Sequence, residues 1–142
     1  MSRSYNFIDH TADIAAEING SSLEELFSAG ADAWLNSIVD ENKFESDDSI
    51  EIDLSASSGE ELLVSFLNEL NYLLITKKWL SLKILSLKID SSEENWELSA
   101  ELGGTEIKKD FQLKNEIKSV TYHQVEIVKT DSNYSTLVVF DI

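Results

Sequence analysis

Two segments of the chain place apolar residues at the spacing of an amphipathic helix. Each begins with a serine followed three residues later by a glutamate, the capping box that marks a helix start. We therefore expect helices over residues 22–38 and 59–76. The capping boxes are Ser22 with Glu25 and Ser58 with Glu61, and the apolar stripes are Leu23, Phe27, Trp34, Ile38 and Leu62, Phe66, Leu70, Leu73, Leu74.

Much of the remaining chain alternates apolar and polar residues, the pattern of half-buried β-strands. A change of phase between Ile84 and Leu85 indicates a β-bulge, and Gly103-Gly104 suits a hairpin turn. The run from Leu137 to Phe140 is nearly all apolar, as in a central strand covered on both faces. We expect strands at Tyr5–Phe7, Ile14–Ile18, Ile50–Leu54, Leu80–Ile89, Trp96–Leu102, Val120–Val128 and Tyr134–Phe140, with Ile107, Phe111 and Leu113 continuing the sheet.

These elements predict an α+β fold. We expect a two-layer sandwich, in which two main helices pack on a largely antiparallel mixed sheet of seven or eight strands. The length of 142 residues suits one domain over residues 1–142. No apolar run approaches the roughly 20 residues of a membrane helix, and the first seven residues show no signal-peptide pattern. With no cysteine in the chain, disulfides and thiolate sites are excluded, and we expect a cytoplasmic protein.

The strongest bulk feature is the acidic charge. Eleven basic residues stand against 27 acidic ones, which gives a net charge of −16. Because extensive contact with nucleic-acid phosphates requires lysine and arginine, we expect neither direct nucleic-acid binding nor binding to anionic membranes. Such a surface favours cations and basic protein surfaces, although the charge could also serve solubility alone.

The first candidate for chemistry is the segment from Asp9 to Asp13, between the first two predicted strands. Its sequence is Asp-His-Thr-Ala-Asp, so two carboxylates and the imidazole of His10 lie within five residues. Carboxylate oxygens are the ligands that Ca²⁺ and Mg²⁺ prefer. The alternative is that Asp9 and Asp13 satisfy turn amides, as aspartates often do.

The second candidate is the end of the chain, where the last predicted strand runs into Asp141-Ile142. The side chain of Asp141 and the terminal carboxylate supply oxygens two residues apart, anchored by an apolar strand. If this end lies beside the segment from Asp9 to Asp13, several negative groups converge and need a cation to stay ionised. The alternative is an ordinary exposed terminus.

The third candidate is the segment from Lys118 to His123. On a strand, Lys118 and Tyr122 share one face, while Thr121 and His123 share the other. Lys118 could present a cation beside an acidic site or simply face solvent, and His123 suits a partly buried hydrogen-bonded role. No glycine-rich phosphate loop, Gly-x-Ser-x-Gly or HExxH motif is present, so clustered acids without a nucleophile favour a cation cage over catalysis.

Several motifs follow one another in order along the length of the chain. They are Tyr5, Asp9-His10-Thr11-Ala12-Asp13-Ile14, Gly20, Leu23-Glu24-Glu25-Leu26-Phe27, Leu62-Leu63-Val64-Ser65-Phe66-Leu67-Asn68-Glu69-Leu70, Ile117-Lys118-Ser119-Val120-Thr121-Tyr122-His123 and Val138-Val139-Phe140-Asp141-Ile142. In these motifs the chain resembles the archease family. Ala15, where the family often has Gly, and Ser119, where Ala is common, are small-for-small departures.

The resemblance implies a non-enzymatic, metal-binding accessory protein. Its partner would be an RtcB-type RNA ligase, which joins RNA ends after tRNA splicing and must be guanylylated with GTP and a divalent metal. The cofactor would be a divalent cation, calcium first, with Mg²⁺ or Mn²⁺ as alternatives. By motif position Asp13, Asp141 and Ile142 would be the metal ligands, Asp9 and His10 would shape the loop behind them, and Lys118 would lie nearby.

Two other functions remain open at this point. The same acidity and an older idea about the family favour a chaperone-like adaptor for a tRNA-modifying enzyme such as a methyltransferase. A metal-dependent hydrolase built on Asp9, His10 and Asp13 is the remaining alternative.

Overall fold

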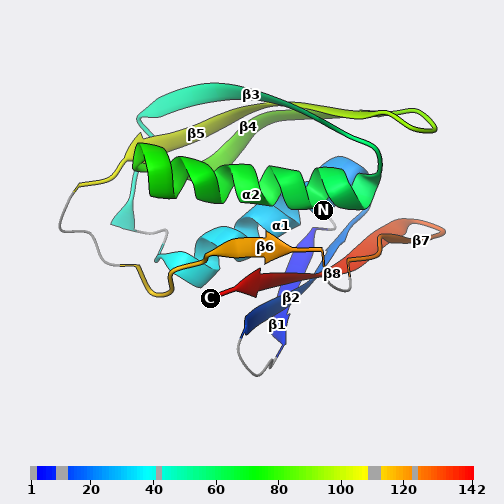
Figure 1. The fold of residues 1–142 in the computed structure, drawn as a ribbon, viewed down its shortest axis with the longest axis horizontal. Coiled ribbons are helices and arrows are strands. Elements are labelled where there is room, and N and C mark those ends of the chain that lie inside the picture. Colours follow the sequence, from blue (N-terminus) through cyan, green and yellow to red (C-terminus); the bar gives the residue numbers. More distant parts are fainter. Residues whose placement is uncertain (1–2, 9–12, 41–42, 109–112, 123–124) are drawn as a thin grey trace.

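In the computed structural model two α-helices and eight β-strands form within the described residues, which are 3–8, 13–40, 43–108, 113–122 and 125–142 (Figure 1). The helices are α1 (Leu23–Ile38) and α2 (Gly59–Lys77). The strands are β1 (Ser4–Ile8), β2 (Asp13–Gly20), β3 (Asp48–Ala56), β4 (Trp79–Ser91), β5 (Trp96–Glu106), β6 (Ser119–Thr121), β7 (Val128–Thr130) and β8 (Asn133–Asp141).

The strands pair antiparallel and divide into two sheets. The first has the order β1-β2-β8-β6, with β7 also paired to β8, and the second has the order β3-β5-β4. Both helices lie between the two sheets, as Figure 1 shows, and each contacts both of them: α1 packs on β1, β2, β8 and β4, and α2 packs on β3, β4, β5 and β6. The expected α+β class with two helices and antiparallel strands is confirmed, and the strands form two sheets instead of one.

Both predicted capping boxes begin the helices. The Ser22 hydroxyl accepts the Glu25 backbone N–H at 3.1 Å, and the Ser58 hydroxyl accepts that of Glu61 at 3.1 Å. These bonds satisfy amides that a helix N-terminus otherwise leaves unpaired. At the other end of α2, Lys78 adopts a left-handed conformation with φ of 55° and stops the helix. No helix in the described ranges is both long and apolar enough to cross a membrane.

The core lies where the inner faces of the sheets meet the helices. The aromatic rings at its centre come from both helices and from β8, and Phe27 and Phe66 lie 5.9 Å apart between ring centroids. Strand β8 contributes Val138 and Phe140, both fully buried, as expected for a central strand. Close packing of this kind fixes how the sheets sit on the helices.

The expected hairpin turn at Gly103-Gly104 is wrong, because both glycines lie inside β5. A Cβ on Gly104 would lie 2.2 Å from the Leu80 carbonyl oxygen and 2.7 Å from the Trp79 ring. Glycine is therefore needed here for close approach of β4 to β5 and not for a turn. The expected bulge is confirmed: the register of β4 shifts between Ile84 and Ser86, and also between Ser81 and Lys83.

The segment expected as one strand over Val120–Val128 forms two short strands. Both β6 and β7 pair with β8, at its C-terminal and N-terminal ends respectively. Of the residues between them, the described ones, 122 and 125–127, belong to no strand. Ile107 and Leu113, expected to continue the sheet, lie outside the strands, and Phe111 lies outside the described residues.

Candidate metal centre

The C-terminal strand brings Asp141 directly opposite Asp13. In the register of β2 and β8 these two residues are Cα partners, and Asp141 is also the partner of Ser119 in β6. Directly opposite residues of antiparallel strands share one face, with Cβ atoms about 4.5–5.5 Å apart. A row of oxygen-bearing side chains, Asp13, Asp141 and Ser119, therefore crosses three neighbouring strands at one end of the sheet.

The electrostatics of this row favour a cation. Like charges placed directly opposite one another in a sheet destabilise the pair. Asp13 and Asp141 are both partly buried, so solvent screens their repulsion less than it would at an open surface. Their oxygens are hard donors of the type that Ca²⁺ and Mg²⁺ take.

Neighbouring backbone groups hold the Asp141 end of the row. The Lys118 N–H donates to the Asp141 carbonyl oxygen at 2.8 Å, immediately before β6 begins. The Asn68 side chain on α2 then holds both backbone groups of Val120: its Oδ1 accepts the N–H at 2.8 Å, and its Nδ2 donates to the carbonyl at 3.0 Å. Helix α2 therefore positions β6, and β6 positions the end of β8.

A second asparagine of α2 continues this support into the core. The Asn71 side chain is 4% exposed and has two partners. Its Oδ1 accepts the Trp34 indole N–H at 3.0 Å, and its Nδ2 donates to the Ile117 carbonyl at 2.8 Å. The segment that leads into β6 is thus fixed to both helices. Sequence reasoning missed this role of Asn68 and Asn71, although two asparagines within an apolar helix were a signal for it.

Some of the other predicted site residues lie near this row, and the rest lie outside the described residues. Lys118 is exposed and precedes β6, and Tyr122 is 56% exposed and follows it, so the expectation that they share a strand face is wrong. Lys118 reaches the row through its backbone N–H. Ile142 follows Asp141 directly and is 39% exposed. Asp9, His10 and His123 lie outside the described residues.

The donor set fits a divalent cation in part. Among the residues described here, no group of three or more His, Cys, Asp or Glu side chains could hold a metal ion. Two carboxylates and the backbone oxygens of Ile142 would supply some of the six to eight oxygens that Ca²⁺ takes. The oxygen-only chemistry of the described donors suits Ca²⁺, Mg²⁺ or Mn²⁺ and not a soft metal.

A cavity of about 350 Å³ adjoins Asp13. Its apolar wall comes from the first two strands, and its polar wall comes from the end of α1 and residues 114–115. The Lys114 backbone N–H donates to the Ile38 carbonyl at 2.7 Å, which closes the end of α1 there. The lining residues are Phe7, Ile8, Asp13, Ile14, Asn36, Ser37, Lys114 and Asn115.

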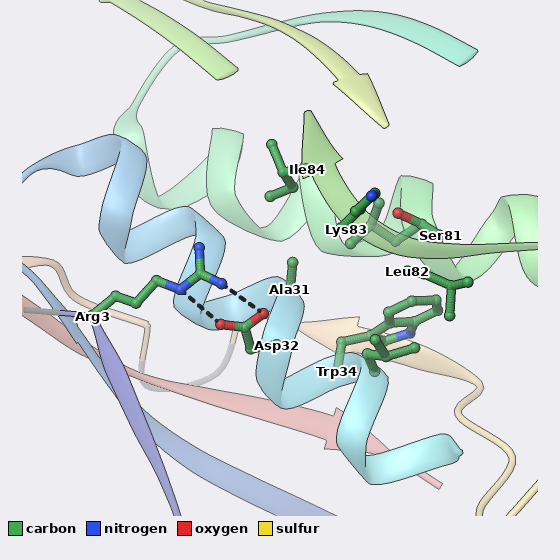
Figure 2. A pocket seen from close by; sticks show the side chains of 10 residues that line it. Arg3, Ala31, Asp32, Trp34, Ser81, Leu82, Lys83 and Ile84 are labelled. Carbon is green, nitrogen blue, oxygen red and sulfur yellow. Dashed lines mark hydrogen bonds and ion pairs between the residues drawn. The ribbon is translucent and has the colours of Figure 1, made fainter. Parts of the chain in front are cut away.

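A second cavity, of about 220 Å³, lies between α1 and β4 and contains none of the predicted site residues (Figure 2). Arg3 lines it and binds Asp32 of α1 through two contacts, Nε to Oδ2 at 3.0 Å and Nη2 to Oδ1 at 3.3 Å. The arginine thus ties the start of β1 to α1. Lys83 of β4 also lines this cavity, and Arg3, one of its two cations, is engaged by Asp32.

Comparison with known proteins identifies the family. The model of the archease protein family matches residues 5–142. The chain belongs to the archease family. Archeases from Methanosarcina barkeri and Archaeoglobus fulgidus are 38% and 34% identical to it, with 99% and 97% of this chain and 97% and 98% of theirs covered.

Two solved structures resemble this archease-family chain over almost its full length. The solution structure of protein 1598 from Methanobacterium thermoautotrophicum has a TM-score of 0.81 and 29% identity, and covers 97% of this chain and 98% of its own. The crystal structure of an archease from Thermotoga maritima, described as a possible chaperone, has a TM-score of 0.61 and 26% identity, with 95% and 94% covered. The expected resemblance is confirmed.

Proposed function

We propose that this archease-family chain is a non-enzymatic, metal-binding accessory protein that activates an RtcB-type RNA ligase in tRNA splicing and RNA repair. The observation that carries the proposal is the cross-strand pairing of Asp13 with Asp141. This pairing brings together, at one end of one sheet, the two motifs that contain the metal ligands implied by the family resemblance. The activation would consist of faster guanylylation and turnover of the ligase.

In this function Asp13, Asp141 and Ile142 hold the divalent cation, with Asp9 and His10 shaping the loop behind them. The bound cation supplies the divalent charge that guanylylation requires. The Lys118 N–H holds the Asp141 carbonyl oxygen and so fixes the course of the chain into Ile142. The chain's own contribution is to orient these oxygens at an accessible sheet end that can be presented to a partner.

The overall charge supports a protein partner. A net charge of −16 repels RNA but is complementary to the basic surface that an RNA ligase needs around its substrate. The accessory protein can therefore dock beside the RNA channel without competing for RNA. A metal delivered at an acidic docking surface is also attracted there by the field of the whole chain.

The test is ligase guanylylation, measured as incorporation of labelled GTP with and without this chain. We expect Asp13→Ala and Asp141→Ala each to abolish the stimulation, because each removes a carboxylate of the pair, while both proteins stay folded. Asp53→Ala removes one exposed carboxylate from the other sheet and is the matched control. Full stimulation by both site variants would falsify the proposal.

A chaperone-like adaptor for a tRNA-modifying enzyme such as a methyltransferase is the second candidate. The description of the Thermotoga maritima relative as a possible chaperone favours it. In that function the metal would be incidental. Recovery of a methyltransferase, without a ligase, on the tagged chain and on its Asp13→Ala variant alike would favour the adaptor over the ligase activator.

A further inference from the structure

Both outer strands of the second sheet carry features that discourage pairing with another chain. Exposed edge strands template unwanted pairing unless charges, bulges or short length protect them. On β3 the exposed acids Asp48, Glu51 and Asp53 project along the edge strand. On β4 two irregularities of register interrupt the strand. A partner strand would therefore meet repulsion or mismatch at this sheet.

The edge formed by β6 and β7 in the first sheet is closed by side chains of α2. Asn68 takes both backbone groups of Val120, at 2.8 and 3.0 Å. Nearer β7, the Ile127 N–H donates to Glu60 Oε2 at 3.0 Å. The helix thus occupies backbone groups that an added strand would need at this side of the sheet.

Strand β1, at the opposite edge of the first sheet, has a different character. It lies beyond β2 in the strand order, and its sequence, Ser-Tyr-Asn-Phe-Ile, contains no charge and no proline. Four of its five residues are exposed, including Phe7 at 48% and Ile8 at 43%. Because alternate backbone groups of an edge strand point away from the sheet, β1 presents hydrogen-bonding groups beside exposed apolar side chains.

The 350 Å³ cavity lies at the end of this edge. Phe7, Ile8 and Ile14 form its apolar side, and Ser37 and Asn115 belong to its polar side. The Asn115 Nδ2 already donates to the Ser37 carbonyl at 2.7 Å, so that part of the wall is held in place. A side chain from a strand laid along β1 would find a preformed recess with an apolar wall.

We propose that β1 is a docking edge that pairs with an extended segment of the partner protein, adding a strand to the sheet. One apolar side chain of the segment enters the cavity beside Phe7, and basic residues flank it. Main-chain bonds supply affinity in this mode, and the side-chain recess supplies specificity. This inference rests on the proposed function, because the partner used to test it is the ligase.

The net charge favours a different protein, and not a second copy of this chain, as the binding partner at β1. Two copies of this chain, each with a net charge of −16, would repel one another. A basic segment would instead be attracted by the negative field of the chain. Asp13 lines the cavity at the end of β1, so the acidic row of the candidate metal centre lies next to the docking edge. A segment bound to β1 would hold the partner next to that row.

The direct test is hydrogen exchange of the chain with and without the purified ligase. We expect amides within Ser4–Ile8 to slow by about tenfold or more on addition of ligase, because a new strand gives outward N–H groups an acceptor. Amides of Val128–Thr130, in a short exposed strand of the same sheet, serve as the internal control and should keep their rates. Unchanged exchange in β1 while the ligase is bound overturns strand addition and leaves the proposed function standing.

The second test compares two substitutions of equal charge and equal exposure. Phe7 and Val128 are each 48% exposed, so Phe7→Lys and Val128→Lys add the same charge at similar surface positions. We expect Phe7→Lys to weaken ligase binding by about tenfold or more, as for loss of an apolar anchor. We expect Val128→Lys to stay within about threefold. Melting curves of both variants verify that they are folded.

Equal weakening by the two variants would show a general charge effect and overturn the docking edge. A concentration-dependent dimer that Phe7→Lys dissociates would assign the edge to a second copy and likewise overturn the proposal. Failure of the unaltered chain to bind the ligase would overturn this inference together with the proposed function.

Discussion

At the scale of single residues, two asparagines of α2 connect the core to the candidate metal centre. Each uses its amide as both donor and acceptor, Asn71 inside the core and Asn68 at the edge of β6. An aliphatic residue would fill the same space but would leave backbone groups and, at Asn71, the Trp34 indole N–H without these partners. Buried polar groups are costly when they lose their partners and cost little when fully satisfied, which explains polar residues in this position.

Replacing Asn71 by alanine tests this residue. The change leaves the Trp34 indole N–H and the Ile117 carbonyl without their partner inside the protein. We expect a loss of about 2–4 kcal/mol in the free energy of unfolding, since each unsatisfied buried group costs about 1–3 kcal/mol. Urea denaturation gives the value.

The control for Asn71 is Asn36→Ala. The Asn36 side chain donates to the Asp32 carbonyl of its own helix and links no separate elements. We expect a change below about 1 kcal/mol, helped by the higher helix propensity of alanine. Similar losses in the two variants would contradict the bridging role assigned to Asn71.

At the scale of elements, β8 is the strand on which the candidate centre depends. It pairs with β2 on one side and with β6 and β7 on the other, so its end carries Asp141 between Asp13 and Ser119. Strand β6 has three residues, which is too short to be stable alone. Its attachment to α2 through Asn68 supplies the missing support.

Hydrogen exchange of the Val120 amide measures that attachment. In Asn68→Ala the amide loses its acceptor, and we expect its exchange to accelerate by up to about tenfold, the equivalent of one net hydrogen bond. Asn68→Asp keeps the Oδ1 acceptor and should retain most of the protection. An unaltered rate in Asn68→Ala would mean that β8 alone holds β6.

At the scale of the whole molecule, the acidic charge and the candidate centre act together. Any bound cation reduces the electrostatic repulsion within a chain whose net charge is −16. The reduction is largest where two carboxylates face one another across a sheet. A cation held as proposed would bind the folded state and not the unfolded one, because the unfolded chain separates Asp13 from Asp141, and its binding would therefore stabilise the fold. Calcium and chelator should therefore change stability in opposite directions.

We expect saturating calcium to raise the free energy of unfolding by about 2.7 kcal/mol at a concentration 100 times the dissociation constant. Asp141→Asn should remove most of this gain, because the variant lacks one of the facing charges. Asp53→Asn makes the same charge change on the other sheet and should keep the gain. A melting temperature that responds to neither calcium nor chelator would count against the centre.

The sequence by itself determined the local structure. Apolar spacing and the two capping boxes located both helices to within one residue at each end, and the change of phase located the bulge in β4. These features depend on residues close together in the chain. Motifs within the chain likewise predicted the family, which comparison then confirmed.

Only the tertiary structure decided which strands meet. The same alternation is compatible with one sheet or two, and it does not say that β4 approaches β5 closely at Gly104. The placement of Asp141 opposite Asp13 likewise depends on the register between β2 and β8, which lie near opposite ends of the chain. Register is set by burial of one sheet face against the helices, and that packing exists only once the whole chain has folded.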